Sequence, residues 1–541
     1  MPPSLVGALD QGTTSTRFVL YRIENRARAK LTPVASHQME HRQIFPQPGW
    51  CEHDPEEIVA NSLECMSHAL AKVPGGAAKE DVACVGITNQ RETTVAWDSV
   101  TGKPLHNALV WLDTRTQRVC DDLVTALGSA DALRAQNGLP ISTYFSGTKM
   151  RWLVEHVDAV RAAAGNGTLR VGTMETWLVW SLTRENNFVT DVTNASRTML
   201  MDLRTLSWDT NLCAKVFGVN ANATKLPESA LPKIVSNCEF EKFGVIQRGA
   251  LAGVKITATI GDQHAATLGQ RCTPGEAKNT YGTGCFALLN TGYGEPVFSQ
   301  KGLCTTIAWR LGDDQAVAFA LEGSIAIAGA GVAWLRDNLG IIKDAAEVEA
   351  KASAVPDSGG VTFVPAFSGL FAPRWRPDAR GVIVGLTQHS NANHICRALL
   401  DAICFQTKDV LDAMNFDMNF SAATAAEADS TNGGNQTQSR SIKCLRVDGG
   451  ASANGLLMQT QANVLGVNVA RPGNVETTAL GAALAAGVGA RLWSSSDIFA
   501  KELGEEGDDE ETVFACTTDA ETRQEKYEKW ADAVERSLGL A

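Results

Sequence analysis

The feature that most constrains the fold of this chain is a short pattern that occurs twice. Residues 10–17, DQGTTSTR, lie between two apolar runs, and residues 277–290 repeat this order of an apolar run, a Gly/Thr turn and a second apolar run. Each copy predicts two antiparallel strands joined by a tip. A chain of 541 residues is too long for one core, so two such units favour an α/β protein with two similar halves.

The tip at residues 10–17 has the chemistry of a phosphate site. Gly12 permits close approach of the backbone, and the hydroxyl groups of Thr13 and Thr14 can donate to phosphate oxygens. Asp10 would repel phosphate unless a hydrated Mg²⁺ lay between them. Taken alone, the tip favours an ordinary Gly/Thr hairpin turn over a phosphate site, because such turns are common.

Composition narrows the classes of function. The chain has 48 basic and 60 acidic side chains, and its net charge of −12 argues against a nucleic-acid surface. No apolar run approaches the roughly 20 residues needed to span a membrane, and no secretory signal is visible. The 13 cysteines show no C-x-x-C pair, which predicts reduced thiols in a cytoplasmic protein.

Two further tips contain an acidic residue after a predicted strand. Residues 261–267 include Asp262, and residues 448–454 contain the run Asp-Gly-Gly. We expect the first domain to cover residues 1–253 and the second to cover residues 254–541. A surface insertion is expected at 421–441, where Ala, Ser, Thr, Asn, Gln and Gly dominate.

Adjacent Arg91 and Glu92 lie in a polar run between two predicted strands, which makes this run a candidate site. Trp111 and Phe286 are aromatic residues on short apolar segments. The alternatives are a solvated ion pair for the first two and ordinary core positions for the aromatics.

Together the three tips resemble the phosphate-1, phosphate-2 and adenosine motifs of the actin-like (ribonuclease H-like) ATPase fold. More specific motifs resemble the FGGY carbohydrate kinase family, and within it the members that phosphorylate glycerol. The resemblance runs from about residue 4 to about residue 493. It rests on GITNQRETT (86–94), VWLDTRT (110–116), YFSGTK (144–149), TNASRTML (193–200), GDQHAA (261–266), NTYGTGCF (279–286) and LRVDGGASAN (445–454).

The resemblance implies two actin-like ATPase domains that flank a nucleotide and substrate cleft. Its substrates would be glycerol and ATP with Mg²⁺, and it implies a homo-oligomer, dimer or tetramer. The implied glycerol-binding residues are Arg91, Glu92, Trp111, Tyr144, Asp262, Gln263 and Phe286. The implied nucleotide-binding residues are Thr13, Thr14, Ser15, Arg17, Thr283, Gly329, Gly450 and Asn454.

Asp10 and Asp262 would hold Mg²⁺, Asp10 through water, and Asp262 would also act as the general base. A primary alcohol is a poor nucleophile at neutral pH, so a carboxylate must take its proton as it attacks. Two alternatives remain open: a kinase of the same family for another polyol or a ketose, and a non-catalytic actin-like nucleotide-binding protein.

Overall fold

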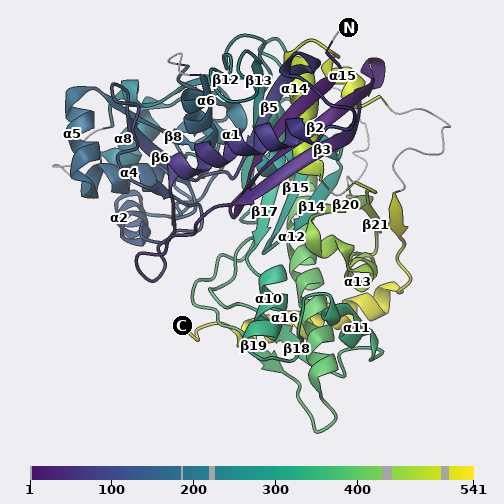
Figure 1. Ribbon diagram of the computed structural model, residues 1–541. Coiled ribbons are helices and arrows are strands. Elements are labelled where there is room, and N and C mark those ends of the chain that lie inside the picture. The colour runs from purple at the N-terminus through teal and green to yellow at the C-terminus, as the bar shows by residue number, and fades with distance from the viewer. Residues whose placement is uncertain (1–2, 184–186, 219–225, 429–440, 475, 501–510) are drawn as a thin grey trace.

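The computed structural model describes residues 3–183, 187–218, 226–428, 441–474, 476–500 and 511–541, without the side chains of 423–428. Two large β-sheets form its framework (Figure 1). The strands of the first are β1 (Leu5–Gln11), β2 (Ser15–Asn25), β3 (Lys30–Glu40), β5 (Val82–Asn89) and β13 (Ile256–Gly261). Those of the second are β14 (Ala277–Tyr281), β15 (Cys285–Tyr293), β16 (Cys304–Trp309), β17 (Ala318–Ile325), β20 (Cys444–Asp448), β21 (Asn468–Arg471) and β22 (Thr512–Phe514).

The two sheets share one strand arrangement. Their orders are β13-β5-β1-β2-β3 and β16-β17-β15-β14-β20-β21-β22. In each sheet the first strand pairs antiparallel with the next one and parallel with a later one, β1 with β2 and β5, and β14 with β15 and β20. The two Gly/Thr tips therefore occupy equivalent places, and the predicted likeness of the two halves is confirmed.

Smaller strands lie beside the two large sheets. A four-stranded sheet contains β4 (Glu52–His53), β7 (Ala108–Leu109), β6 (Thr94–Asp98) and β8 (Leu169–Thr173). Three two-stranded pairs are β9 (Val189–Asp191) with β12 (Lys233–Val235), β10 (Met201–Asp202) with β11 (Ser207–Trp208), and β18 (Thr362–Val364) with β19 (Val382–Val384).

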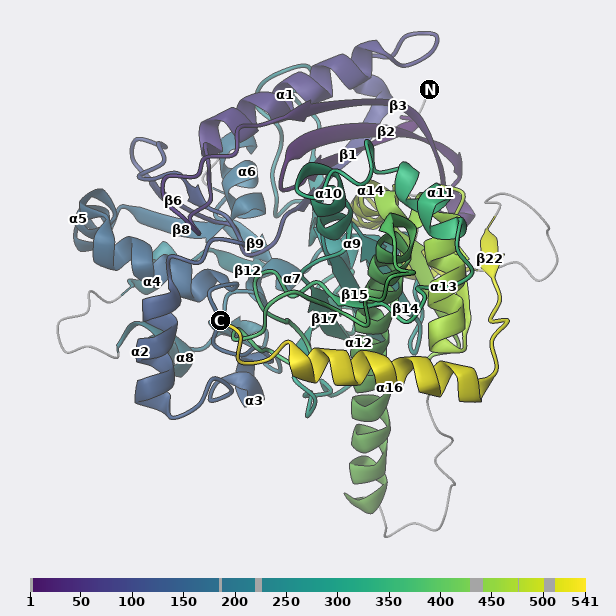
Figure 2. The same cartoon turned by 90° about the horizontal axis from the view of Figure 1, so that it is seen from below.

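The helices of the first part are α1 (Pro55–Ala71), α2 (Gln117–Leu127), α3 (Arg134–Asn137), α4 (Ser146–His156), α5 (Asp158–Asn166), α6 (Met174–Thr183), α7 (Val192–Ala195), α8 (Thr210–Phe217) and α9 (Asp262–Gly269). Those that follow are α10 (Gly329–Asp337), α11 (Glu347–Ser353), α12 (Ala392–Ala428), α13 (Gly455–Leu465), α14 (Thr477–Gly489), α15 (Ser495–Ile498) and α16 (Ala520–Arg536). Helix α1 lies across the first sheet, and α10–α13 and α16 gather around the second (Figures 1 and 2). Figure 2 shows the last part of α12 extending beyond its neighbours.

Helices α9 and α14 pack against each other, and their apolar residues join a core that includes residues of both sheets. Ala479, Ala482 and Ala483 of α14 are fully buried. A Cβ on Gly481 would lie 1.8 Å from the carbonyl oxygen of Ala265, so only glycine lets the two helices approach this closely. This packing fixes the start of α9, and hence Asp262, relative to both sheets.

Three features differ from the sequence-based expectations. Strand β13 pairs with β5 in the first sheet, so at the level of the sheets the change of unit comes later than residue 254. The polar run with Arg91 and Glu92 lies between two strands as expected, but these strands, β5 and β6, belong to different sheets. Helix α12 continues through residues 421–428 of the expected insertion, and the remainder from 429 to 440 lies outside the described residues.

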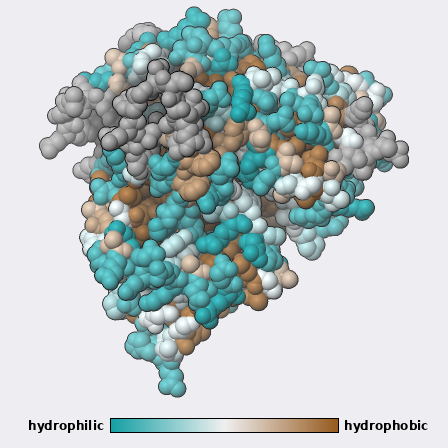
Figure 3. Space-filling view, turned by 180° about the vertical axis from the view of Figure 1, so that it is seen from behind, coloured by the Kyte–Doolittle hydropathy of each residue, from teal (hydrophilic) through white to brown (hydrophobic). Residues whose placement is uncertain are grey.

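Within the described part of the chain, no helix combines the length and the apolar character needed to cross a bilayer. The face in Figure 3 is mostly hydrophilic, and its hydrophobic residues occur in small separate patches.

Candidate active site

The first Gly/Thr tip connects β1 to β2. Its turn is closed by the Gly12 N–H, which donates to the Ser15 carbonyl at 2.9 Å, and Thr14 is exposed. Asp10 and Arg17 face each other across the strand pair just below the tip. The tip therefore presents hydroxyl groups and a glycine backbone outward, with one acidic and one basic group behind them.

The equivalent tip of the second sheet, between β14 and β15, carries exposed Thr283. The carbonyl oxygen of Thr283 accepts from the N–H groups of Ala328 and Ala330 at 2.9 and 3.0 Å. Gly329, the first residue of α10, donates its N–H to the carbonyl of Gly282 at 3.0 Å. The structure thus places Gly329 directly against this tip.

Arg17 and Ser15 are held by neighbouring polar side chains. Arg17 donates to Gln38 Oε1 at 2.6 and 2.9 Å, and Gln38 donates to the Ser15 hydroxyl at 2.8 Å. Arg17 also forms an ion pair with Glu476, which directly precedes α14. The guanidinium of Arg17 is thereby oriented from both parts of the chain.

Asp262 is the first residue of α9 and follows β13 directly. Its Oδ1 accepts from the Gln263 backbone N–H at 2.6 Å and lies 3.2 Å from Arg91 Nε. Its side chain remains 26% exposed, whereas that of Arg91 is 2% exposed. The carboxylate is therefore accessible from the site while its orientation is fixed by two donors.

Burial raises the pKa of Asp262, against the opposing charge of Arg91. Burial also raises the pKa of Asp10 to about 7, opposed by Arg17 and reinforced by the nearby charge of Asp262. The negative charges of Asp10 and Asp262 lie close together where water solvates them poorly, and the nearby arginines compensate them only in part. Mg²⁺ prefers carboxylate and water oxygens, so this pair fits a divalent cation.

Three aromatic side chains form one wall of the site. The rings of Trp111 and Tyr144 meet edge to face with centroids 5.5 Å apart, and those of Trp111 and Phe286 do so at 5.8 Å. All three are partly exposed, which argues against the alternative that they are core residues. The indole N–H of Trp111 donates to the Thr13 hydroxyl at 2.9 Å. The wall thus touches the first Gly/Thr tip.

Two charged residues with no sequence-based role join this site. Glu322 of β17 accepts from Arg91 Nη1 at 2.5 Å and Nη2 at 2.9 Å. Arg197 donates through Nε to Glu92 Oε1 at 2.5 Å and through Nη2 to Glu322 Oε1 at 3.1 Å. The one sequence signal for Glu322 is a lone acidic residue in a buried apolar strand, and Arg197 lies in the TNASRTML motif.

Gln263 lies deeper than Asp262 and is 8% exposed. Its side-chain oxygen accepts from the ammonium of Lys278, a fully buried residue of β14 that also donates to the Thr280 hydroxyl at 2.8 Å. Because Lys278 occupies the side-chain oxygen of Gln263, the amide N–H groups are what Gln263 can offer to a ligand. Burial lowers the pKa of Lys278, although Asp448 and Asp262 favour its charged form.

The third tip follows β20. A Cβ on Gly449 would lie 2.6 Å from the carbonyl oxygen of Tyr281, whereas nothing lies within 4 Å of the Cβ position of Gly450. Asn454 caps α13 by accepting from the Leu457 N–H at 2.8 Å. Gly450 thus has open space beside it, as a nucleotide site requires.

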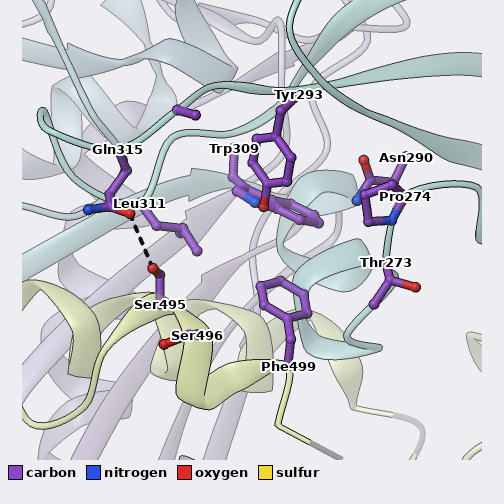
Figure 4. A pocket seen from close by; sticks show the side chains of 11 residues that line it. Thr273, Pro274, Asn290, Tyr293, Trp309, Leu311, Gln315, Ser495, Ser496 and Phe499 are labelled. Carbon is purple, nitrogen blue, oxygen red and sulfur yellow. Dashed lines mark hydrogen bonds between the residues drawn. The ribbon is translucent and has the colours of Figure 1, made fainter.

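A cavity of about 480 Å³ lies elsewhere, at the far end of β15 from Phe286 (Figure 4). Tyr293, Trp309 and Phe499 surround it, and Ser495 donates to Gln315 at its edge at 3.4 Å. None of its lining residues is charged. A phosphate group would therefore find no counter-charge in this cavity. None of the lining residues belongs to the candidate active site, so the cavity is separate from it.

Comparison with known proteins identifies the family. Residues 5–269 match the N-terminal domain of the FGGY family of carbohydrate kinases, and residues 277–490 match its C-terminal domain. The chain belongs to the FGGY family of carbohydrate kinases. The resemblance noted in the sequence motifs is therefore confirmed.

Individual FGGY kinases resemble this chain over nearly its whole length. It is 50% identical to a glycerol kinase of Arabidopsis thaliana, with 99% of this chain and 98% of that protein covered. It is 49% identical to a glycerol kinase of Nocardia farcinica, with 98% of each covered. Among solved structures, Plasmodium falciparum glycerol kinase with ADP has a TM-score of 0.83 and 37% identity, covering 99% of this chain and 98% of that one. A xylulose kinase from Lactobacillus acidophilus, at 21% identity and a TM-score of 0.77, shares the fold.

Proposed function

We propose that the protein transfers the γ-phosphoryl group of ATP to glycerol and forms sn-glycerol 3-phosphate. One contact carries this proposal: the aromatic wall touches the first Gly/Thr tip through Trp111 and Thr13. A small polyol against that wall would lie next to a phosphate on the tip. The relatives at about 50% identity, which are glycerol kinases, support the same substrate.

The polyol pocket supplies both donors and acceptors. Arg91 offers the guanidinium N–H groups that Glu322 and Asp262 leave unused, and the Gln263 amide offers further N–H groups. Glu92 and Asp262 offer carboxylate oxygens, and the aromatic wall packs against the carbon chain. Glycerol has three hydroxyl groups on a three-carbon chain, which match these donors and acceptors and the aromatic wall.

Asp262 would act as the general base. Its side chain is accessible, oriented by Arg91 and by the Gln263 N–H, and its raised pKa makes it a better proton acceptor than an ordinary carboxylate. The proton of the attacking hydroxyl passes to the Asp262 carboxylate as the oxygen attacks the γ-phosphorus. The bond between that phosphorus and the β,γ-bridging oxygen breaks, and ADP leaves. Arg17 and the hydroxyl groups of Thr13, Thr14 and Thr283 would donate to the charge that spreads over the phosphoryl oxygens.

On the nucleotide side, Ser15 would join Thr13 and Thr14 at the phosphates, and the adenosine would lie near Gly329, Gly450 and Asn454. Asp10 and Asp262 would hold Mg²⁺, which when bound partly neutralises the phosphate charge. A cytoplasmic, homo-oligomeric enzyme with no nucleic-acid partner remains the prediction from the sequence.

A substrate panel tests the proposal. Purified protein is assayed for ADP release with glycerol, dihydroxyacetone, xylulose and ribulose, each with and without Mg²⁺. We expect Mg²⁺-dependent ADP release that is fastest with glycerol. A preference for a ketose would assign the chain to another FGGY activity, and no release with any polyol would favour a non-catalytic nucleotide-binding protein.

A further inference from the structure

Four charged side chains beneath the polyol pocket form one buried group, which we call the charge cluster: Arg91, Glu92, Arg197 and Glu322. Each is at most 3% exposed. The cluster balances two positive and two negative charges. Because a buried ion without a partner is strongly unfavourable, each member depends on the others for its place.

The cluster joins the two sheets. Arg91 follows β5 of the first sheet and Arg197 follows α7, whereas Glu322 lies on β17 of the second sheet. Glu322 is thus the one cluster member from the second sheet, and both arginines converge on it. Burial opposes its negative charge, but Arg197 and Arg91 together outweigh this effect and lower the pKa of Glu322.

The contacts fix the two polyol-binding members in one orientation. Glu322 accepts from both Nη atoms of Arg91, and Asp262 lies at Nε, so rotation of the guanidinium is blocked on two sides. Arg197 holds Oε1 of Glu92, and no hydrogen bond from the described residues is made to Oε2. Glu92 has a positive φ of 59°, which a non-glycine residue adopts only when its surroundings hold it there.

We infer that Glu322 and Arg197 are positioning residues for the phosphorylation of glycerol. Glu322 reaches from the second sheet to orient Arg91, and Arg197 orients Glu92 so that its second carboxylate oxygen faces the polyol. Neither residue touches the substrate. The inference rests on the proposed function, and it adds that the orientation of Arg91, next to the first sheet, depends on a residue of the second sheet.

The first experiment compares Glu322→Gln with Asp409→Asn, a matched change of a buried, arginine-paired carboxylate that accepts from Arg374, Tyr527 and Trp530 outside the pocket. We expect Glu322→Gln to lower kcat/KM for glycerol on the order of 100-fold, the effect of a misplacement of about 1 Å. The KM for ATP should stay near the wild-type value. Asp409→Asn should leave both constants near wild type.

The second experiment separates positioning from general support of the fold. Glu322→Gln is combined with Arg91→Ala, and kcat/KM for glycerol is measured for both single variants and the pair. If Glu322 acts through Arg91, the pair loses little more than Arg91→Ala alone. Independent losses that multiply would overturn the inference.

Arg197→Lys provides a second variant for the case in which Glu322→Gln does not fold. Lysine keeps the charge but loses the guanidinium fork, so KM for glycerol should rise on the order of tenfold or more with ADP affinity unchanged. Its matched control is Arg151→Lys, another buried arginine, which pairs with Glu155 at 2.7 Å. An unchanged glycerol KM in Arg197→Lys would contradict the inference, whereas an inactive wild-type protein would contradict the proposed function itself.

Discussion

The change of Asp262 to asparagine tests the catalytic mechanism most directly. The substitution keeps the size of the side chain and removes the group that accepts the proton. A positioned general base contributes about 10²- to 10⁴-fold, or roughly 2.7 to 5.4 kcal/mol of transition-state stabilisation. Because burial raises the pKa of Asp262, its driving force for proton transfer exceeds that of an ordinary carboxylate. We therefore expect kcat to fall toward the upper end of this range.

The structure also predicts that Asp262→Asn folds. Arg91 loses one charged neighbour but keeps both hydrogen bonds to Glu322, so no arginine is left unpaired. The free energy of unfolding should therefore change by much less than the roughly 3–5 kcal/mol that removal of the sole partner of a buried ion costs.

The assay is glycerol-dependent ADP release at saturating substrates, together with ADP affinity measured by calorimetry. Asp417→Asn is the matched control, since Asp417 is 1% exposed and accepts from the Ser299 hydroxyl at 2.5 Å and the Gln300 N–H at 2.9 Å, outside the site. The control should keep its kcat. An Asp262→Asn enzyme with kcat within tenfold of wild type would refute the assignment of the base.

Four further predictions follow from the site and its surroundings. Gly329→Ala should raise the KM for ATP about tenfold and leave the KM for glycerol nearly unchanged. The added Cβ would lie 2.7 Å from the Gly282 carbonyl oxygen, and overpacking of this kind costs about 1–3 kcal/mol. Equal changes in both KM values would contradict this prediction. Asp10→Asn should raise the Mg²⁺ concentration for half-maximal activity roughly tenfold, measured by Mg²⁺ titration, and an unchanged requirement would remove Asp10 from the metal site. Burial and the neighbouring Asp191 raise the pKa of Glu175 to about 7. The folded state therefore keeps this proton to a higher pH than the unfolded state does, and the free energy of unfolding falls as pH rises from about 4.5 to 7. Glu175→Gln should flatten the dependence of the melting temperature on pH across that window, and a profile parallel to that of the wild type would count against the prediction. The two parts should close over glycerol and a non-hydrolysable ATP analogue to exclude water, which predicts a smaller radius of gyration by small-angle scattering, and identical curves would argue against closure.

Local patterns account for several of the elements. An Asp-Pro pair is typical of a helix start, and α1 begins at Pro55, where the Asp54 carboxylate accepts from the Glu56 N–H at 2.9 Å. Both Gly/Thr tips lie between the expected strands. Strand β3 has no such signal, because it is an edge strand of mixed polar residues that includes Pro33.

The amino-acid sequence by itself determined the two strand–tip–strand units and the family, because each depends on short contiguous motifs. Through the family resemblance it also predicted the residues of a polyol pocket. Only the tertiary structure decided how the tip that carries Arg91 is held. Arg91 and Glu322 are 231 positions apart and come from different sheets, so their ion pair leaves no periodicity or spacing in the sequence. The first Gly/Thr tip was recognisable from its own eight residues, but its contact with the aromatic wall depends on how β1, β2 and the chain after β7 pack in three dimensions.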